Sequence, residues 1–314
     1  MSPIPASRRL RDRAHRLLHT AFVAGQRFGL DILPRHFYSN IPDIRQLQAD
    51  SSWKLPRSMI GVNGADLDEQ LTFLRACCEP LAPRLGAEGE IHARACAQNG
   101  TDGYGRIESD VLFSFVASHR PRKIIQIGSG VSTAVILNAA IVADYQPEVV
   151  CIEPHPNEYL VDAARRKKIV LLARRAQQIE LSVLTGLQHG DLLFVDSTHA
   201  VKPGSEVNQL ILEVLPRLAL GCYVHFHDIY FPYDYQASLL TTLFFSEEST
   251  LLHAFLACNR RYEIAASLSM LHHGRSQELR TLLPGYRPAV LDFGLYGPTQ
   301  KGDFPSSLYL RVVA

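Results

Sequence analysis

The chain has 314 residues, of which 46% are hydrophobic, and its 32 basic and 31 acidic residues give a net charge of +1. This length is sufficient for one large hydrophobic core with additions. The near balance of charge excludes a general attraction to polyanions, so we expect no nucleic-acid partner. No apolar run approaches the roughly 20 residues that cross a bilayer, and the N-terminus lacks the apolar core of a secretory signal. We therefore expect no transmembrane segment.

Cysteine usage bears on the compartment. The six cysteines form no Cys-x-x-Cys pair. Cys151 and Cys222 lie in apolar, strand-like runs, where a cysteine behaves as a small buried hydrophobe. This usage fits a reducing environment, and we expect a cytoplasmic protein.

The first segment, residues 1–33, is predicted to hold a basic amphipathic helix over residues 7–28. Its charged and apolar positions are Arg8, Arg9, Arg11, Arg13 and Arg16 against Leu10, Leu17, Leu18 and Phe22. This pattern is typical of a solvated helix packed on its own domain, or of one that docks on a membrane surface or a partner. The sequence leaves both readings open.

Residues 34–120 form a second segment, which we expect to cover the main domain. Residues 34–64 are rich in proline and turn residues and show no sustained period. Helical spacing of apolar residues then predicts helices over 66–85 and 107–118, which would flank the main sheet.

Residues 121–314 alternate short apolar runs with helical stretches, which predicts a parallel α/β sheet. Continuous apolar runs are what strands covered on both faces require. The expected strands are 124–127, 149–152, 169–172, 192–195 and 223–226, and the expected helices are 131–143, 157–167 and 206–218. A helical region over 237–258 and two late strands, 262–271 and 307–313, complete the prediction.

A glycine-bearing turn follows the first expected strand. Gly128 and Gly130 let the backbone approach a ligand, and the N–H groups of the next helix favour electron-rich atoms. Thr133 stands where the dinucleotide fingerprint has its third glycine, so the motif alone is weak. Glu153, 25 residues after Gly128 at the end of the second strand, could hold the hydroxyls of a ribose or be a solvent-facing carboxylate.

Polar residues also follow the fourth and fifth expected strands. Asp196 and His199 share one turn, and His227 and Asp228 share the other. Such a cluster suits acid–base chemistry or a divalent metal, and spacing does not choose between them. His225 is better read as a hydrogen-bonded core histidine. Three tyrosines in the next loop could line a substrate pocket or pack the turn: Tyr230, Tyr233 and Tyr235.

These residues resemble the class I S-adenosylmethionine-dependent methyltransferases, in particular a bacterial family with a Gly-Ser-Gly-x-Ser-Thr first motif and an Asp-Ser-x-His fourth strand end. The likeness spans most of the chain in several separated motifs. The motifs are Phe37–Asp43, Tyr104–Gly105, Ile127–Thr133, Cys151–Pro154, Gly190–His199, His225–Ile229 with Phe231–Pro232, and Ser307–Leu310.

The resemblance implies a Rossmann-like, doubly wound, mostly parallel seven-stranded sheet, with a sixth strand, an antiparallel seventh and an N-terminal helical cap. S-adenosylmethionine would be the cofactor. The residues implied to bind it are Gly128, Ser129, Gly130, Ser132, Thr133, Glu153, Ala176, Gln177 and Asp196, and those implied to meet the acceptor include Tyr38.

Two comparisons within that resemblance affect the site. Gln126 stands where such enzymes often have an acidic residue, so a charge near the cofactor's amino end is lost. Some sugar O-methyltransferases hold a divalent metal on acidic groups at the ends of the fourth and fifth strands. Asp196, His227 and Asp228 are similar, although a histidine replaces a carboxylate, and Mg²⁺ or another divalent metal is a second expected cofactor.

The sequence therefore predicts transfer of a methyl group to an oxygen, or less readily a nitrogen, of a small molecule or glycan precursor. His227 or His199 would accept the proton, and Asp196 or Asp228 would orient it or bind a metal. Two alternatives are a nicotinamide-dependent oxidoreductase, which the missing third glycine disfavours, and a non-catalytic binding or scaffold protein that keeps the cofactor fold.

Overall fold

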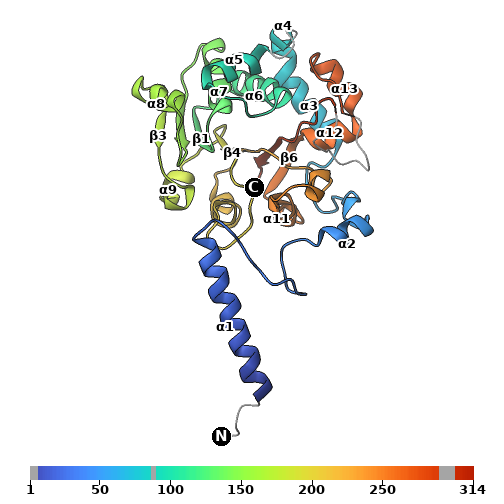
Figure 1. Cartoon of the computed structure of the whole chain (residues 1–314). Helices are drawn as coiled ribbons and strands as arrows, with labels where there is room; N and C mark the ends of the chain where they lie inside the picture. Colours follow the sequence, from blue (N-terminus) through green and yellow to red (C-terminus); the bar gives the residue numbers. More distant parts are fainter. Residues whose placement is uncertain (1–5, 86–89, 290–300) are drawn as a thin grey trace. The chain divides into compact units, whose positions relative to one another are not determined.

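A computed structural model describes residues 6–85, 90–289 and 301–314, and the side chains of 6–12 and 237 are not described. The chain divides into two compact units, Met1–Ala49 and Asp50–Ala314. The first unit contains α1 (Ala6–Gln26) and α2 (Ile44–Ala49) (Figure 1). The helix expected over 7–28 is therefore present.

The second unit is built on one seven-stranded sheet with the order β3-β2-β1-β4-β5-β7-β6. The first five strands are parallel neighbours, and β7 pairs antiparallel with both β5 and β6. The strands are β1 (Lys123–Ile127), β2 (Glu148–Ile152), β3 (Val170–Leu172), β4 (Leu192–Val195), β5 (Tyr223–Phe226), β6 (Tyr262–Ser267) and β7 (Leu308–Val312). The expected mostly parallel, seven-stranded α/β fold is confirmed.

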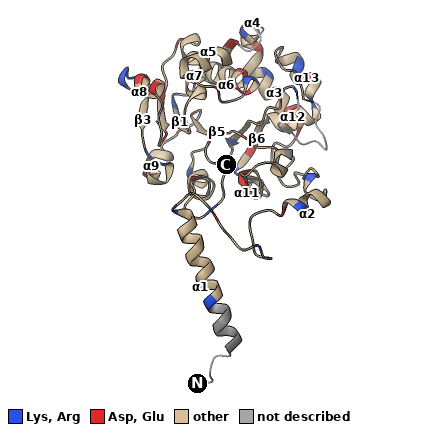
Figure 2. Ribbon diagram, in the orientation of Figure 1, with Lys and Arg blue, Asp and Glu red and all other residues tan. Residues whose placement is uncertain are grey.

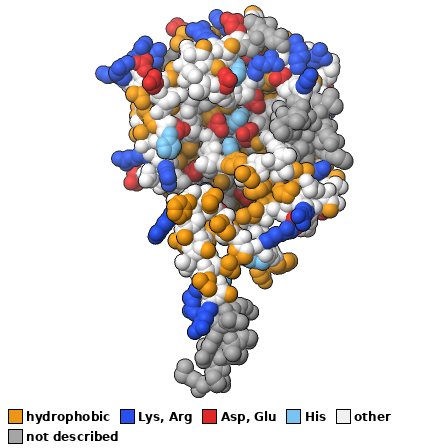
Figure 3. Space-filling view, viewed as in Figure 1, with side chains coloured by type: hydrophobic (Ala, Val, Ile, Leu, Met, Phe, Trp, Pro, Cys, Tyr) orange, Lys and Arg blue, Asp and Glu red, His pale blue; other side chains and the backbone are white. Residues whose placement is uncertain are grey.

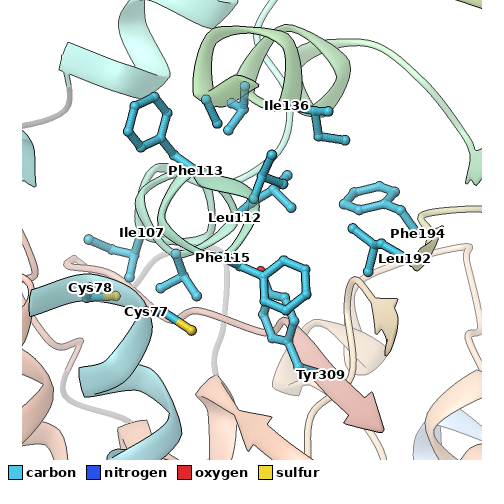
Figure 4. Close-up of a cluster of buried hydrophobic side chains, with 14 of the residues drawn as sticks. Cys77, Cys78, Ile107, Leu112, Phe113, Phe115, Ile136, Leu192, Phe194 and Tyr309 are labelled. Carbon is cyan, nitrogen blue, oxygen red and sulfur yellow. The ribbon is translucent and has the colours of Figure 1, made fainter. Parts of the chain in front are cut away.

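One face of this sheet carries helices from both ends of the unit. Leu192 and Phe194 of β4 point into this core, where they meet the helix that contains Leu112 and Phe115 (Figure 4). The elements that contribute to this core are α3 (Leu67–Cys78), α4 (Ala82–Leu85), α5 (Glu90–Asn99), α6 (Arg106–His119), α7 (Val131–Val142), α8 (Glu158–Arg165), α12 (Leu268–Gly274) and α13 (Ser276–Leu282). The sequence before residue 120 thus supplies part of the main core.

The opposite face has its own core because successive strand residues point to opposite sides. Leu193 and Val195 lie on this side of β4. The covering elements are α9 (Leu181–Leu184), α10 (Glu206–Gln209) with the π-helical turn Leu210–Val214 and the 3₁₀ turn Leu215–Arg217, and α11 (Glu248–Leu256). Further 3₁₀ turns are Ser52–Lys54, Glu79–Leu81, Ala176–Gln178 and Ala237–Leu240.

Local capping explains where several helices begin. The Asp66 side chain accepts hydrogen bonds from the backbone N–H groups of the first turn of α3, and Asn157 accepts from Leu160 N–H at the start of α8. Unpaired N–H groups at a helix start need such acceptors. These caps set the entry points of helices that pack against the sheet.

Two sequence predictions are wrong in extent. The late strand expected over 262–271 ends at Ser267, because the Ser267 hydroxyl accepts a hydrogen bond from Met270 N–H and caps α12. The helical region expected over 237–258 reduces to a 3₁₀ turn and α11. Apolar residues alone do not distinguish a strand from a buried helix, so the capping serine decides the first case.

Candidate active site at the carboxyl ends of β1, β2, β4 and β5

A cavity of about 630 Å³ lies where the strand order reverses between β1 and β4. Ligands of open α/β sheets bind at this point, because the carboxyl ends of neighbouring strands and their loops diverge there. The cavity is lined by residues 127–128, 152–155, 175–177, 196–198 and 202–206. The structure therefore brings Gly128, Glu153, Ala176, Gln177 and Asp196 to one cavity, as the sequence led us to expect.

The turn after β1 requires glycine at one position. Gly128 has a φ of +76°, and a Cβ atom added there would lie 1.7 Å from the backbone oxygen of Asp196. Its N–H donates to the carbonyl of Ile152, 3.1 Å away. The ends of β1, β2 and β4 can approach one another this closely only because Gly128 lacks a side chain.

Glu153 is held in place by backbone donors. Its Oε1 accepts from His155 N–H at 2.9 Å, and its Oε2 lies 3.4 Å from Ser129 N. The hydroxyl of Ser197, also in the cavity wall, is buried and interacts with the carboxylate of Glu206. A positioned carboxylate and a hydroxyl in the same wall fit a ligand that carries its own hydroxyl groups.

A buried carboxylate that the sequence did not point to braces the far wall of the cavity. Glu206 Oε1 accepts from both the N–H and the hydroxyl of Thr198, at 2.9 and 2.6 Å. Its Oε2 accepts from the Gln177 amide at 2.9 Å. Gln177 is therefore fixed beside the cavity by Glu206.

Ser132 and Thr133, which the resemblance implies bind the cofactor, form hydrogen bonds with Gln126. The Gln126 amide donates to the Ser132 hydroxyl at 2.6 Å, and its Oε1 accepts from Thr133 at 2.8 Å. All three side chains are buried, and none is among the residues that line the cavity. These hydroxyls lock the first turn of α7 onto β1.

A second cavity of about 220 Å³ lies beside the ends of β4 and β5. It is lined by His199, Asp228, Tyr230, Tyr235, Gln236, Ser238, Leu239, Thr242, Phe244 and Ser246. Figure 3 shows acidic and histidine side chains gathered near the middle of this face of the molecule. Asp196 lines the larger cavity, and His199 and Asp228 line the smaller one.

The joining cluster consists of Asp196, His199, His227 and Asp228. His199 Nε2 lies 3.7 Å from carboxylate oxygens of both Asp196 and Asp228. His227 Nδ1 lies 3.5 Å from Asp196 and 3.6 Å from Asp228. His199 and Asp228 have φ angles of +56° and +57°, a strained conformation for residues with side chains, and such strain concentrates at functional sites. The four residues expected from separate strand ends do meet.

His199 has a buried partner from a distant helix. Its Nδ1 lies 2.7 Å from Oε2 of Glu248, which is fully buried at the start of α11. Burial acts to lower the pKa of His199, but the bond and charge of Glu248 and the charges of Asp228 and Asp196 raise it above its usual value. Burial raises the pKa of Glu248.

His227 differs from His199 in its electrostatic surroundings. Burial opposes its charge, but the carboxylates of Asp228 and Asp196 raise the pKa of His227 to about 10. Burial likewise acts to raise the pKa of Asp196, yet the positive charge of His227 holds it below its usual value. His227 therefore carries a proton at neutral pH.

Glu108 of α6 is a further acidic residue near His227. Its Oε1 accepts from Ser306 N–H at 2.9 Å, and the Ser306 hydroxyl donates to Asp228 at 2.9 Å. Burial raises the pKa of Glu108. Neither Glu108 nor Glu248 has a sequence signal, because each belongs to no motif and its burial is visible only in three dimensions.

His225 is a core histidine, as predicted. It is fully buried, and its Nε2 lies 3.0 Å from both the Tyr104 and the Ser307 hydroxyls. Burial and the neighbouring charge of His227 hold the pKa of His225 well below its usual value.

The tyrosines predicted to bind the substrate do not all lie in one place. Tyr230 and Tyr235 line the smaller cavity, whereas the Tyr233 ring lies 4.8 Å from that of His273 and is not among its lining residues. Tyr38 belongs to the other unit of the chain. Within the described residues, no group of three or more His, Cys, Asp or Glu side chains is arranged to hold a metal ion.

Residues 125–229 match the model of a family described as a methyltransferase domain. These residues form a methyltransferase domain. The antiparallel β7 agrees with the fold that the resemblance to class I S-adenosylmethionine-dependent methyltransferases implies. All four members of the joining cluster lie within the matched residues.

Three known proteins are similar to the chain that contains this methyltransferase domain. An uncharacterized protein from Archaeoglobus fulgidus is 29% identical over 170 residues, which are 52% of this chain and 72% of that protein. A structure described as an O-methyltransferase candidate from Klebsiella pneumoniae has 12% identity, 76% and 96% coverage of the two chains, and a TM-score of 0.43. The S-adenosylhomocysteine-bound methyltransferase PaMTH1 of Podospora anserina has 14% identity, 75% and 95% coverage, and a TM-score of 0.38.

Proposed function

We propose that this protein transfers the methyl group of S-adenosylmethionine to a hydroxyl oxygen of a small, uncharged acceptor such as a glycan precursor. The observation that carries the proposal is the position of the joining cluster. Asp196 lines the larger cavity, His199 and Asp228 line the smaller one, and His199 Nε2 lies 3.7 Å from both carboxylates. Proton-accepting groups therefore stand between a cofactor-sized cavity and a second, acceptor-sized cavity.

The larger cavity fits the cofactor by its donor set. Glu153 would hold the ribose hydroxyls, Ala176 and Gln177 would border the adenine, and the backbone at Gly128 would pass beside the methionine part. The Ser197 hydroxyl, which lines the same cavity, would be a further polar contact for the cofactor. When bound, the cofactor supplies a methyl group already activated by a positively charged sulfur, so positioning accounts for most of the rate.

The smaller cavity favours a neutral, hydroxyl-bearing acceptor. Its lining has amide, hydroxyl and aromatic groups, and no lysine or arginine is among the described residues that line it. A phosphate or carboxylate acceptor would lack a partner and would be repelled by Asp228. A basic amine would be kept protonated by the acidic cluster and could not attack, so oxygen is favoured over nitrogen.

Within the cluster we assign the proton acceptor to His199. Neutral His199 donates its Nδ1 proton to Glu248, which leaves the Nε2 lone pair at the wall of the acceptor cavity. His227 already carries a proton at neutral pH, so it serves as a fixed positive charge beside Asp196 and Asp228. A protonated imidazole has no lone pair for a metal, and the proposal assigns no metal to these residues.

The test is calorimetric titration of the full chain with S-adenosylmethionine and with NAD, followed by transfer of a labelled methyl group to hydroxyl-bearing acceptors. We expect the protein to bind S-adenosylmethionine and not NAD. Glu153→Gln should weaken it by about 10-fold or more, the worth of a hydrogen bond to a charged group. The exposed Glu158→Gln, from the first turn of α8, is the matched control. NAD binding would favour an oxidoreductase, and cofactor binding without transfer to any acceptor would favour a scaffold role.

A further inference from the structure

The N-terminal unit exposes an unusual amount of apolar side chain. Phe28, Phe37 and Tyr38 are 82%, 93% and 86% exposed. Further exposed apolar side chains of this unit are Leu17, Leu18, Val23, Leu30, Ile32, Leu33 and Ile41. We call the described residues 13–45 the N-terminal surface. So many large apolar side chains exposed within one short segment point to an interaction site rather than to ordinary solvent-facing residues.

The helical part of this surface is amphipathic and basic. Ala14, Leu17, Leu18, Ala21, Phe22 and Gly25 recur at the spacing that places them on one face of α1. Arg13 and Arg16 lie on the opposite side and are exposed, and Figure 2 shows a basic position on α1 beside its grey part. The helix therefore presents an apolar face and a cationic face.

Charge is strongly asymmetric along the chain. Residues 1–49 contain eight arginines and three aspartates, a net charge of +5, whereas the remaining 24 basic and 28 acidic residues give −4. This local excess is hidden in the total of +1. It complements an anionic partner.

The segment after α1 adds a pocket that, like α1, combines apolar and basic side chains. A pocket of about 340 Å³ is lined by the apolar Leu33, Ile41 and Ile44 together with Arg35 and Arg45. Arg35 pairs with Asp43, whereas Arg45 has no carboxylate partner among the described residues. Apolar walls beside a free guanidinium suit a ligand with an anionic head and an apolar body.

We propose that the N-terminal surface binds the face of a membrane that contains anionic lipids. A basic helix of this type lies in the interface with its apolar face in the acyl boundary and its cations at the headgroups. A protein groove that accepts a helix would contact α1 alone, whereas the exposed aromatic and aliphatic residues continue through an irregular segment to Ile41. A flat lipid interface accommodates both parts. No helix among the described residues has the length and hydropathy to cross a membrane, so this is surface binding.

The experiment is co-sedimentation of the full-length protein with vesicles of phosphatidylcholine alone or mixed equally with phosphatidylglycerol. We expect binding to the mixed vesicles and little to the neutral ones. Raising the salt concentration from about 0.1 to about 1 M shortens the screening length from about 10 to about 3 Å and should release most of the protein. Equal binding to both vesicle types, or binding to neither, overturns the proposal.

Two variants identify the surface. Each basic residue near an anionic membrane contributes about fivefold in affinity, so Arg13→Gln with Arg16→Gln should weaken binding about 30-fold. Phe28→Ser with Phe37→Ser should also abolish co-sedimentation with the mixed vesicles. Because both phenylalanines are exposed, these substitutions should leave folding unaffected. Lys167→Gln with Lys168→Gln removes two exposed charges from the other unit and should leave binding unchanged.

Other occupants of the surface give different results. If the surface instead contacts a second copy of the chain, the lipid-free protein will sediment as a dimer, and Phe28→Ser with Phe37→Ser will dissociate this dimer. The protein will then show no preference for the mixed vesicles. That outcome overturns the membrane proposal. The membrane proposal does not depend on methyl transfer, so cofactor binding is measured separately.

Discussion

The buried carboxylate of Glu248 lies 2.7 Å from Nδ1 of His199, although 49 residues separate them in the chain. A carboxylate bonded to one ring nitrogen fixes the tautomer and the orientation of the imidazole. The other nitrogen, Nε2, is then held at the wall of the acceptor cavity and 3.7 Å from Asp196 and Asp228. Glu248 is thus a positioning residue for the proposed proton acceptor.

Glu248→Gln should lower kcat by about 100-fold or more, within the range that general bases contribute, because the amide no longer selects the Nδ1–H tautomer. Cofactor affinity should stay within about twofold, since Glu248 does not line the larger cavity. Calorimetry and single-turnover assays measure the two effects. Glu247→Gln, at the neighbouring position outside α11, is the control and should leave both values unchanged. An unaltered kcat in Glu248→Gln would remove Glu248 from the site.

The rate of methyl transfer should rise with pH. His199 must be neutral to accept a proton, and its pKa is raised above 6.5, so the acidic limb of kcat should lie on the alkaline side of that value. His199→Gln should remove this limb and most of the activity. A rate that falls as the pH increases from 6 to 8, or a limb that persists in the variant, contradicts the assignment.

Stability should decline at alkaline pH because of His227. Its pKa is about 10 in the folded protein against an ordinary 6.5, so its stabilising charge is fully present below pH 6.5 and is lost as the pH rises through 10. The associated decrease in unfolding free energy is on the order of a few kcal/mol. Thermal melts of the protein and of His227→Asn across this range should differ most below pH 6.5. NMR titration of the His227 ring gives an independent check, and a pKa near 6.5 would contradict the electrostatic picture.

Gly128→Ala should abolish cofactor binding and destabilise the fold. The new Cβ would lie 1.7 Å from the Asp196 carbonyl, so the ends of β1 and β4 must separate. Gly204→Ala is a matched control, because Gly204 lines the same cavity with a similar φ of +75° but has nothing within 4 Å of its Cβ position. We expect Gly204→Ala to cost about 1 kcal/mol of backbone strain. Similar melting temperatures for the two variants would show that the close approach does not matter.

Sequence patterns were sufficient for the parallel sheet and for most of the site's members. Continuous apolar runs, each followed by polar residues, located β1, β2, β4 and β5 and placed Glu153, Asp196, His199 and Asp228 at their ends. This succeeds because the carboxyl ends of parallel strands share one edge of a sheet. The same patterns failed at Ser267, where a single capping hydroxyl turns an apolar run into α12.

Other parts of the site depended on contacts between distant segments. Glu108, Glu248 and Glu206 have no motif, and only burial beside His227, His199 and Thr198 gives them their roles. Ser132 and Thr133 look like ligand-binding residues of a glycine-rich turn, yet their hydroxyls bond to Gln126.

Local sequence patterns were enough to predict most strands and helices, the glycine turn and the basic N-terminal helix, because these depend on neighbouring residues and their periodicity. The proposed choice of His199 as the proton acceptor rests instead on contacts between segments that are distant in the chain. His199 and His227 both face Asp196 and Asp228, but Glu248 orients the first, and the paired carboxylates keep the second protonated. The physical reason is that a pKa is set by burial and by charges within a few ångströms, and those neighbours come from remote parts of the chain.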